Sequence, residues 1–153
     1  MTYIRIKKIS NNPYAYLVQN ISTDKGPRQK VKKYLGRVYQ FEKQSETEMI
    51  VNAKNKKEFL QQLIQKHLEN HGFKKETSNL INNNISFSLN NLKFTKGVIA
   101  INQGFLCNST IENIISFKKT KDIQKDGTIL AKQLLQAGLP LAEQEFVQLY
   151  SLL

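Results

Sequence analysis

One segment of the chain carries the signals for both ends of an α-helix. Asn55 is a favoured N-cap residue, and Glu58 follows at the spacing of a capping box, where its side chain can reach back to the cap. Gly72 ends the pattern. Apolar residues recur between these signals at three- and four-residue spacing, at Phe59, Leu60, Leu63, Ile64 and Leu68. The segment therefore predicts an amphipathic helix over residues 56–71.

The first forty residues have the alternation of β-strands instead. Three strand-like runs at 3–7, 14–18 and 28–35 are separated by turn sequences at 11–13 and 23–27. Connections this short join antiparallel neighbours. We therefore predict a three-stranded antiparallel β-module over residues 1–40.

The remaining segments predict an α+β fold class. Residues 39–51 form a linker or contain a strand around 48–51, and residues 80–106 alternate as a second small β-region. A helical C-terminal part is predicted over 109–153, within an α+β region over 41–153. Its first helix can be capped by Asn108 or Ser109, its second opens at 126–128 and is closed by Gly138, and its last covers roughly 142–152.

Charge is concentrated at one end of the chain. The first forty residues contain nine Lys and Arg residues against one acid, Asp24, whereas residues 97–153 contain five lysines and five acids. All three arginines lie in the first segment. Clustered positive charge on a chain that can fold is expected of a protein that binds nucleic acid or an anionic membrane surface.

Strict alternation predicts two different faces for the third strand. One carries Gln29, Val31, Lys33 and Leu35, and the other carries Arg28, Lys30, Lys32 and Tyr34. In the first strand, Ile4 and Ile6 lie opposite to Tyr3, Arg5 and Lys7. If the Ile, Val and Leu side chains are buried, the exposed face gathers Arg5, Lys7, Arg28, Lys30 and Lys32 with tyrosines among them. The alternative is a solvated surface without a ligand, which is less favoured because such surfaces normally mix both charges.

These residues are our candidate nucleic-acid site. The cations for phosphate contact are Arg5, Lys7, Lys8, Arg28, Lys30, Lys32, Lys33 and Arg37, and the aromatic residues that pack or stack are Tyr14, Tyr16 and Tyr34. Arginine can also read guanine, and a narrow sheet can enter the major groove of DNA. Tyrosines that stack on unpaired bases would instead favour RNA or single strands. The sequence leaves DNA and structured RNA, including ribosomal RNA, both open.

The sequence gives weaker support to a metal site or to a reactive cysteine. His67 and His71 have the spacing of two metal ligands, but a site needs further ligands, and Cys107 is the only soft donor. His71 beside Gly72 is typical of a helix C-terminus, and Cys107 follows apolar residues as a small buried side chain does. We predict no metal and no cofactor.

The chain also lacks the signatures of an enzyme. No glycine-rich phosphate loop occurs, and the acids Glu112, Asp122 and Asp126 match no catalytic spacing. The single cysteine fits a reducing compartment, no apolar run approaches the ~20 residues of a membrane span, and residues 1–10 lack a secretory h-region. We expect a cytoplasmic, non-catalytic protein.

The block YIRIKKISNNPYAYLVQNISTDKGPRQKVKKYLGRV resembles the N-terminal module that precedes the catalytic domain in some DDE-type insertion-sequence transposases. The matching positions are Tyr3, Ile4 and Arg5; Tyr14, Tyr16 and Leu17; Gly26, Arg28 and Gln29; and Tyr34, Leu35 and Gly36. The rest of the chain lacks the length and the carboxylate triad of a transposase catalytic domain, so that activity is not implied. The segments INQGFLCNSTIENIISF and LAKQLLQAGLPLAEQEFVQLYSLL are similar to small archaeal proteins that pair the same basic front with a helical tail. This likeness implies a stand-alone protein.

The sequence therefore predicts two alternative functions, which belong to different classes. The first is non-catalytic binding of nucleic acid through the basic sheet. The second is a protein–protein adaptor, in which the basic sheet docks an acidic partner and the C-terminal helices mediate self-association.

Overall fold

The structure is a computed structural model that describes residues 2–48 and 51–153. It has mixed α+β architecture, which confirms the predicted fold class. The strands are β1 (Thr2–Ile9), β2 (Asn12–Thr23), β3 (Gly26–Gln40), β4 (Lys74–Glu76), β5 (Asn79–Asn82), β6 (Ile85–Ser88), β7 (Lys93–Phe94), β8 (Val98–Ile101) and β9 (Gly104–Leu106). The helices are α1 (Lys56–Asn70), α2 (Asn108–Ser116), α3 (Ile123–Gln136) and α4 (Glu143–Ser151).

The strands form two sheets. A five-stranded sheet has the order β1-β2-β3-β8-β9, and a four-stranded sheet has the order β4-β5-β6-β7. The first three strands are antiparallel, as predicted. The end of β3, from Val38 to Gln40, pairs in parallel with Val98 to Ala100 of β8. The predicted second β-region is therefore divided between the sheets, because β8 and β9 join the N-terminal strands.

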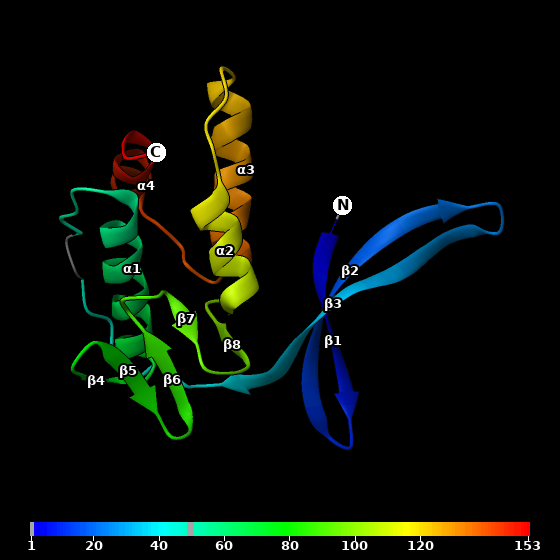
Figure 1. Ribbon diagram of the computed structural model, residues 1–153, viewed down its shortest axis with the longest axis horizontal. Helices are drawn as coiled ribbons and strands as arrows, with labels where there is room; N and C mark the ends of the chain where they lie inside the picture. The colour runs from blue at the N-terminus through cyan, green and yellow to red at the C-terminus, as the bar shows by residue number, and fades with distance from the viewer. Residues whose placement is uncertain (1, 49–50) are drawn as a thin grey trace.

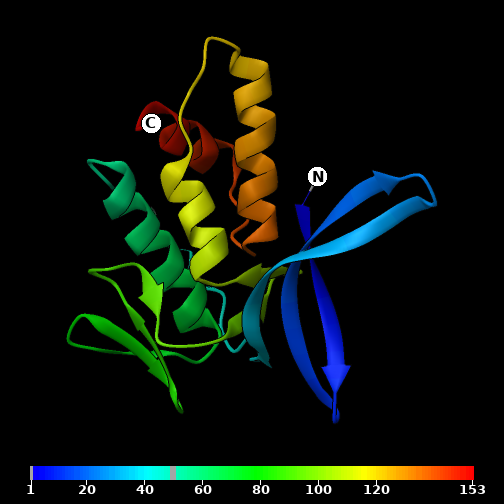
Figure 2. The same cartoon turned by 45° about the vertical axis from the view of Figure 1, so that its right-hand side comes forward.

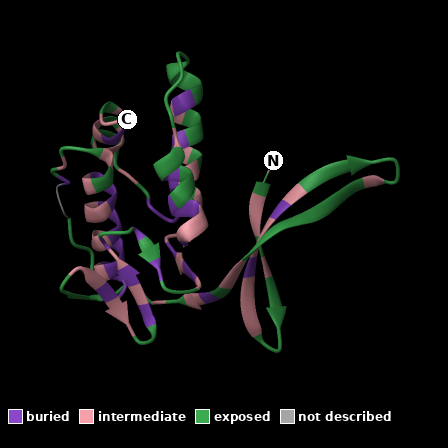
Figure 3. Ribbon diagram, in the orientation of Figure 1, coloured by how far each residue is buried: buried purple, intermediate pink, exposed green. Residues whose placement is uncertain are grey.

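The N-terminal strands project from the rest of the molecule. Figure 1 shows β1, β2 and most of β3 to one side of the helices and the second sheet, and Figure 2 shows the same separation after rotation. The distal part of the β2–β3 hairpin, residues 20–31, is exposed almost throughout (Figure 3). We call residues 20–31 the arm. Val31, predicted to be buried, is 50% exposed because no other described element covers the arm.

Two hydrophobic cores hold the elements together. In the larger one, the predicted apolar side of α1 is fully buried, and α1 lies beside β5 and the C-terminal helices. The smaller one is built from Ala15, Val38, Val98 and Cys107, with Ile4, Ile6, Leu35, Ala100 and Phe105 packed against it. This small core attaches one face of the N-terminal strands to β8 and to the start of α2.

The ends of α1 agree with the sequence prediction except in one contact. Asn55 Oδ1 accepts a hydrogen bond from Glu58 N at 2.8 Å, and His71 is the C-cap. Glu58 Oε2 accepts from the backbone N–H of Lys54 at 2.8 Å, one residue before the cap to which it was predicted to bond. The side chain thus still satisfies a backbone donor at the start of the helix.

The predicted start of α3 at residues 126–128 is wrong. The helix begins at Ile123, because Asp122 is the N-cap and accepts from Lys125 N at 3.1 Å. Asp126 lies one turn inside, and its buried carboxylate accepts from Thr120 N at 2.6 Å and Thr120 Oγ1 at 2.8 Å. Both acids therefore stabilise the same helix start.

Three further boundaries agree with the sequence predictions to different degrees. The N-cap of α2 is Cys107, and Asn108 instead joins α2 to β7 by accepting from Phe94 N at 2.7 Å and donating to Phe94 O at 3.2 Å. Helix α4 agrees with the prediction for 142–152. Glu48 and Val51 lie outside any strand, and residues 49–50 of the predicted strand lie outside the described residues.

Candidate nucleic-acid interface

Strand pairing brings six of the candidate residues onto one face. Arg5 lies opposite Tyr16, which lies opposite Tyr34; Lys7 lies opposite Tyr14, which lies opposite Arg37. Directly opposed residues have their side chains on the same face of a sheet. We call this group the tyrosine face; it consists of Arg5, Lys7, Tyr14, Tyr16, Tyr34 and Arg37.

The tyrosine face points away from the body of the protein. Ile4, Ile6 and Ala15 alternate with its members along β1 and β2, and all three pack in the small core. Alternate residues of a strand point to opposite faces. Burial of one face on β8 and α2 therefore leaves the tyrosine face turned outward.

The aromatic rings form a compact group. The ring centroid of Tyr34 lies 5.2 Å from that of Tyr16 and 6.3 Å from that of Tyr14, in tilted arrangements. Lys7 Nζ lies 5.4 Å from the centre of the Tyr16 ring. Tyr34 is 53% exposed, whereas Tyr14 and Tyr16 are partly buried. Desolvation and then the neighbouring phenols raise the pKa of Tyr34 above its usual value, which already leaves a phenol uncharged at neutral pH.

Arg5 is held by a polar chain across the three strands. Arg5 Nη1 donates to Gln29 Oε1, and Gln29 Nε2 donates to Tyr3 Oη. Tyr3 Oη in turn donates to Asn20 Oδ1 at 3.3 Å. None of these partners is an acid, so the guanidinium is positioned without being neutralised. Gln29 was not among the predicted site residues, since its role depends on a cross-strand contact.

Arg37 is positioned in a similar way. Its Nη2 donates to Asn12 Oδ1 at 3.1 Å, and its guanidinium carbon lies 5.4 Å from the centre of the Tyr39 ring. A cation over an aromatic face is attracted by the ring quadrupole. The sequence did not point to Asn12 and Tyr39, because their residue types and positions indicate only a turn and a linker.

The other predicted cations do not share this face. Arg28 lies opposite Ile21, Lys30 opposite Gln19, and Lys33 opposite Leu17. These β2 residues alternate with Tyr16 and Tyr14, so their partners point to the reverse side. Lys8, opposite Pro13 beside the first turn, alternates with Lys7 and lies on the reverse side too. The predicted gathering with Arg5 and Lys7 on one face is therefore wrong for Arg28 and Lys30, and the strand register gives Lys32 no partner.

Two irregularities in β3 cause the difference. Val31 lies opposite Val18 and Lys33 opposite Leu17, so Lys32 is an extra residue; Leu35 is likewise extra between Tyr34 and Gly36. Each β-bulge resets the alternation along the strand. Tyr34 consequently lies on the same face as Val31, three positions away.

The positive charge of these strands is not neutralised locally. In the described parts of the chain the one ion pair joins Lys43 and Glu46 at 2.6 Å, outside the N-terminal strands. Lys33 lines a cleft of about 210 Å³ with Lys96, beside the first residues of α2. Tyr34 also lines this cleft. Cations thus lie on both faces of the N-terminal strands.

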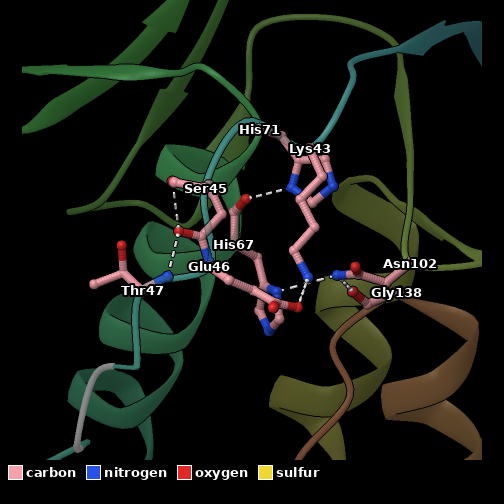
Figure 4. A network of polar contacts seen from close by, with 9 residues as sticks. Lys43, Ser45, Glu46, Thr47, His67, His71, Asn102 and Gly138 are labelled. Carbon is pink, nitrogen blue, oxygen red and sulfur yellow. Dashed lines mark hydrogen bonds and ion pairs between the residues drawn. The ribbon is translucent and has the colours of Figure 1, made fainter.

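The two histidines have structural roles (Figure 4). His67 is buried, and its Nδ1 accepts from Asn102 Nδ2 at 3.0 Å; His71 Nδ1 lies 2.7 Å from His67 O and donates to it. Burial, followed by the charge of Lys66, lowers the pKa of His67 to about 4.

The predicted capping position of His71 and the predicted burial of Cys107 are confirmed. Within residues 2–48 and 51–153, no group of three or more His, Cys, Asp or Glu side chains could hold a metal.

Comparison with known protein families, curated proteins and solved structures finds no match to this chain. Among the helices in the described residues, none has both the length and the apolar character that crossing a bilayer requires.

Proposed function

We propose that this protein binds nucleic acid without acting on it as an enzyme, and that the projecting N-terminal strands make the contact. The observation that carries the proposal is the exposure of Arg5, Lys7 and Arg37 beside Tyr34, with no acid bonded to any of them in the described residues. Unneutralised cations on a projecting sheet attract phosphates and release their counterions. DNA stands ahead of structured RNA, because the sequence of these strands resembles a module of proteins that act on DNA.

The arm supports the same proposal on the reverse side. Arg28 and Lys30 are exposed there, and a two-stranded ribbon is narrow enough to enter a major groove. A cytoplasmic location is part of the proposal and draws on Cys107, a free thiol that persists in a reducing compartment.

Salt dependence tests the proposed function. Affinity for duplex DNA or for a structured RNA should fall steeply as salt increases. Arg28→Ala combined with Lys30→Ala should reduce the slope of log affinity against log salt by about 1 for each phosphate that the variant no longer neutralises. The matched control is Lys118→Ala with Lys121→Ala, which removes the same charge from exposed positions of the C-terminal part. Failure to bind either polymer at low salt, or an equal effect of the control, would contradict the proposal.

A protein–protein adaptor is the second candidate, favoured by an apolar groove between α3 and α4. The groove has a volume of about 770 Å³, and Ile123 and Val147 on its lining are 72% and 61% exposed. Exposed apolar patches of this kind mark interaction sites. Light scattering over a range of protein concentrations distinguishes the candidates, because an adaptor that self-associates here should become monomeric with Val147→Glu.

A further inference from the structure

The sheet leaves much of Tyr34 uncovered. Its neighbours Tyr14 and Tyr16 are partly buried, whereas Tyr34 itself is 53% exposed. A cross-strand aromatic pair stabilises a sheet without requiring that one ring remain exposed. The pairing with Tyr16 therefore accounts for the position of Tyr34 but leaves about half of the residue exposed.

The bulges of β3 are what put this ring among the other tyrosines. Counted by strict alternation from Val31, residue 34 falls on the reverse face, against the body. The extra residue Lys32 brings Tyr34 instead to the face of Tyr16, and the extra residue Leu35 brings Arg37 to the same face. Bulges commonly re-aim a side chain beside a functional site.

Cations lie beside the exposed ring, in its own row and in the row next to it. Arg5 belongs to the same cross-strand row as Tyr34, and Lys7 and Arg37 belong to the next row. The rows of a sheet on one face are separated by about 7 Å, close to the spacing of successive phosphates in an extended strand of nucleic acid. An exposed aromatic ring beside cations is complementary to nucleic acid, in which flat bases alternate along the chain with anionic phosphates.

A duplex cannot use this arrangement. Within a stacked helix only the edges of the bases reach the grooves, because neighbouring base pairs cover their faces. An unpaired base presents its face, and stacking on an aromatic ring is tolerant of base identity. The geometry of Tyr34 thus selects for an unpaired segment over regular duplex.

On this basis we propose that the tyrosine face binds an unpaired segment of nucleic acid, with one base stacked on Tyr34 and its phosphates on Arg5, Lys7 and Arg37. This inference rests on the proposed function and narrows its ligand to a single strand, loop or end. DNA and RNA share this chemistry, so both are used as probes.

The test compares the wild-type protein with Tyr34→Ala on four probes. These are oligo(dT) and oligo(U) of about 15 nucleotides and fully paired DNA and RNA duplexes of similar length. Tyr34→Ala should weaken binding to the single strands about 5- to 100-fold and change duplex binding less than about 2-fold. Tyr34→Phe, which keeps the ring, should bind the single strands like the wild type.

Val31→Ala is the matched control, because Val31 lies on the same face of β3 and is 50% exposed. It should leave binding to all four probes unchanged. If Tyr34→Ala weakens the binding of single strands and duplexes equally, or weakens neither, the inference is overturned. The proposed function still stands in that case, provided that the wild type binds the probes in a salt-dependent way. A wild-type protein that binds none of the four probes at low salt overturns both.

Discussion

Asn102 donates one hydrogen bond from Nδ2 to His67 Nδ1 and a second to the backbone oxygen of Gly138, each at 3.0 Å (Figure 4). An Nδ1 that accepts must carry no proton, so His67 is the neutral tautomer with its proton on Nε2. Protonation of His67 Nδ1 would point its N–H at the N–H of Asn102 Nδ2, so that two donors would face each other. Turning the Asn102 amide would not relieve this, because its oxygen would then face the Gly138 oxygen.

The first prediction is that acidification weakens the fold through His67. The pKa of a histidine in the unfolded chain is about 6.5, so the unfolded state takes up the proton first. The contribution of His67 is therefore fully present above about pH 6.5 and is lost as the pH falls toward the folded pKa of about 4. The total loss is about 3 kcal/mol, at about 1.4 kcal/mol for each pKa unit.

Urea unfolding at several pH values between about 5 and 7.5 should record about 2 kcal/mol of this loss, in a range where ordinary carboxylates stay ionised. His67→Gln should flatten the dependence, whereas His71→Gln, which keeps His67, should retain it. A wild-type free energy of unfolding that is constant over this range contradicts the assignment.

The second prediction concerns the contact between β9 and the end of α3. A Cβ added at Gly104 would lie 2.2 Å from Gly138 N and 2.4 Å from Leu135 O, and backbone atoms cannot give way as a side chain can. Gly104→Ala should therefore cost roughly 3 kcal/mol or more.

Gly127→Ala is the matched control. Gly127 is inside α3, and an added Cβ there meets nothing within 4 Å. This substitution should stabilise the protein by about 0.5–1 kcal/mol, since glycine is a poor helix former. Thermal unfolding of both variants checks the pair, and similar melting temperatures would show that the close approach is not tight.

The third prediction separates the two acids at the start of α3. Asp126→Asn replaces an acceptor by an amide that cannot accept from both donors of Thr120, and should cost about 1–3 kcal/mol. Asp122→Asn keeps an oxygen for Lys125 N, and asparagine caps about as well as aspartate, so its cost should stay below about 0.5 kcal/mol. Chemical denaturation measures both, and a larger loss for Asp122→Asn would reverse the assignment.

Elements whose signals are local were predictable from the sequence. The N-cap Asn55, the apolar spacing and Gly72 all belong to α1 or its immediate neighbours, and the helix lies where they indicated. The same is true of α4 and of the three antiparallel N-terminal strands. The start of α3 was missed because two acids stand four residues apart, and only packing shows which one caps.

The faces of β3 were not predictable. The bulge at Leu35 is marked by Gly36, which has a φ of 123°, but no glycine or proline marks the bulge at Lys32, and nothing distinguishes Lys32 from the lysines beside it in the sequence. Arg5, Lys7 and Tyr34 were nevertheless placed on one face correctly, while Arg28 and Lys30 were not. The pairing of Val38 with Val98 could not be predicted either, since it joins strands separated by α1 and the whole second sheet.

Strand β3 belongs to the projecting N-terminal strands and also, through its pairing with β8, to the body of the protein. This affects the order in which the fold forms during synthesis. The two N-terminal hairpins are synthesised before β8, and the pairing within each hairpin is local, so it can form quickly. Val38, Tyr39 and Gln40 then present an unpaired strand edge until β8 has been made. Closure of that edge is a late event, so the most cationic part of the chain is assembled before the body to which it is finally joined.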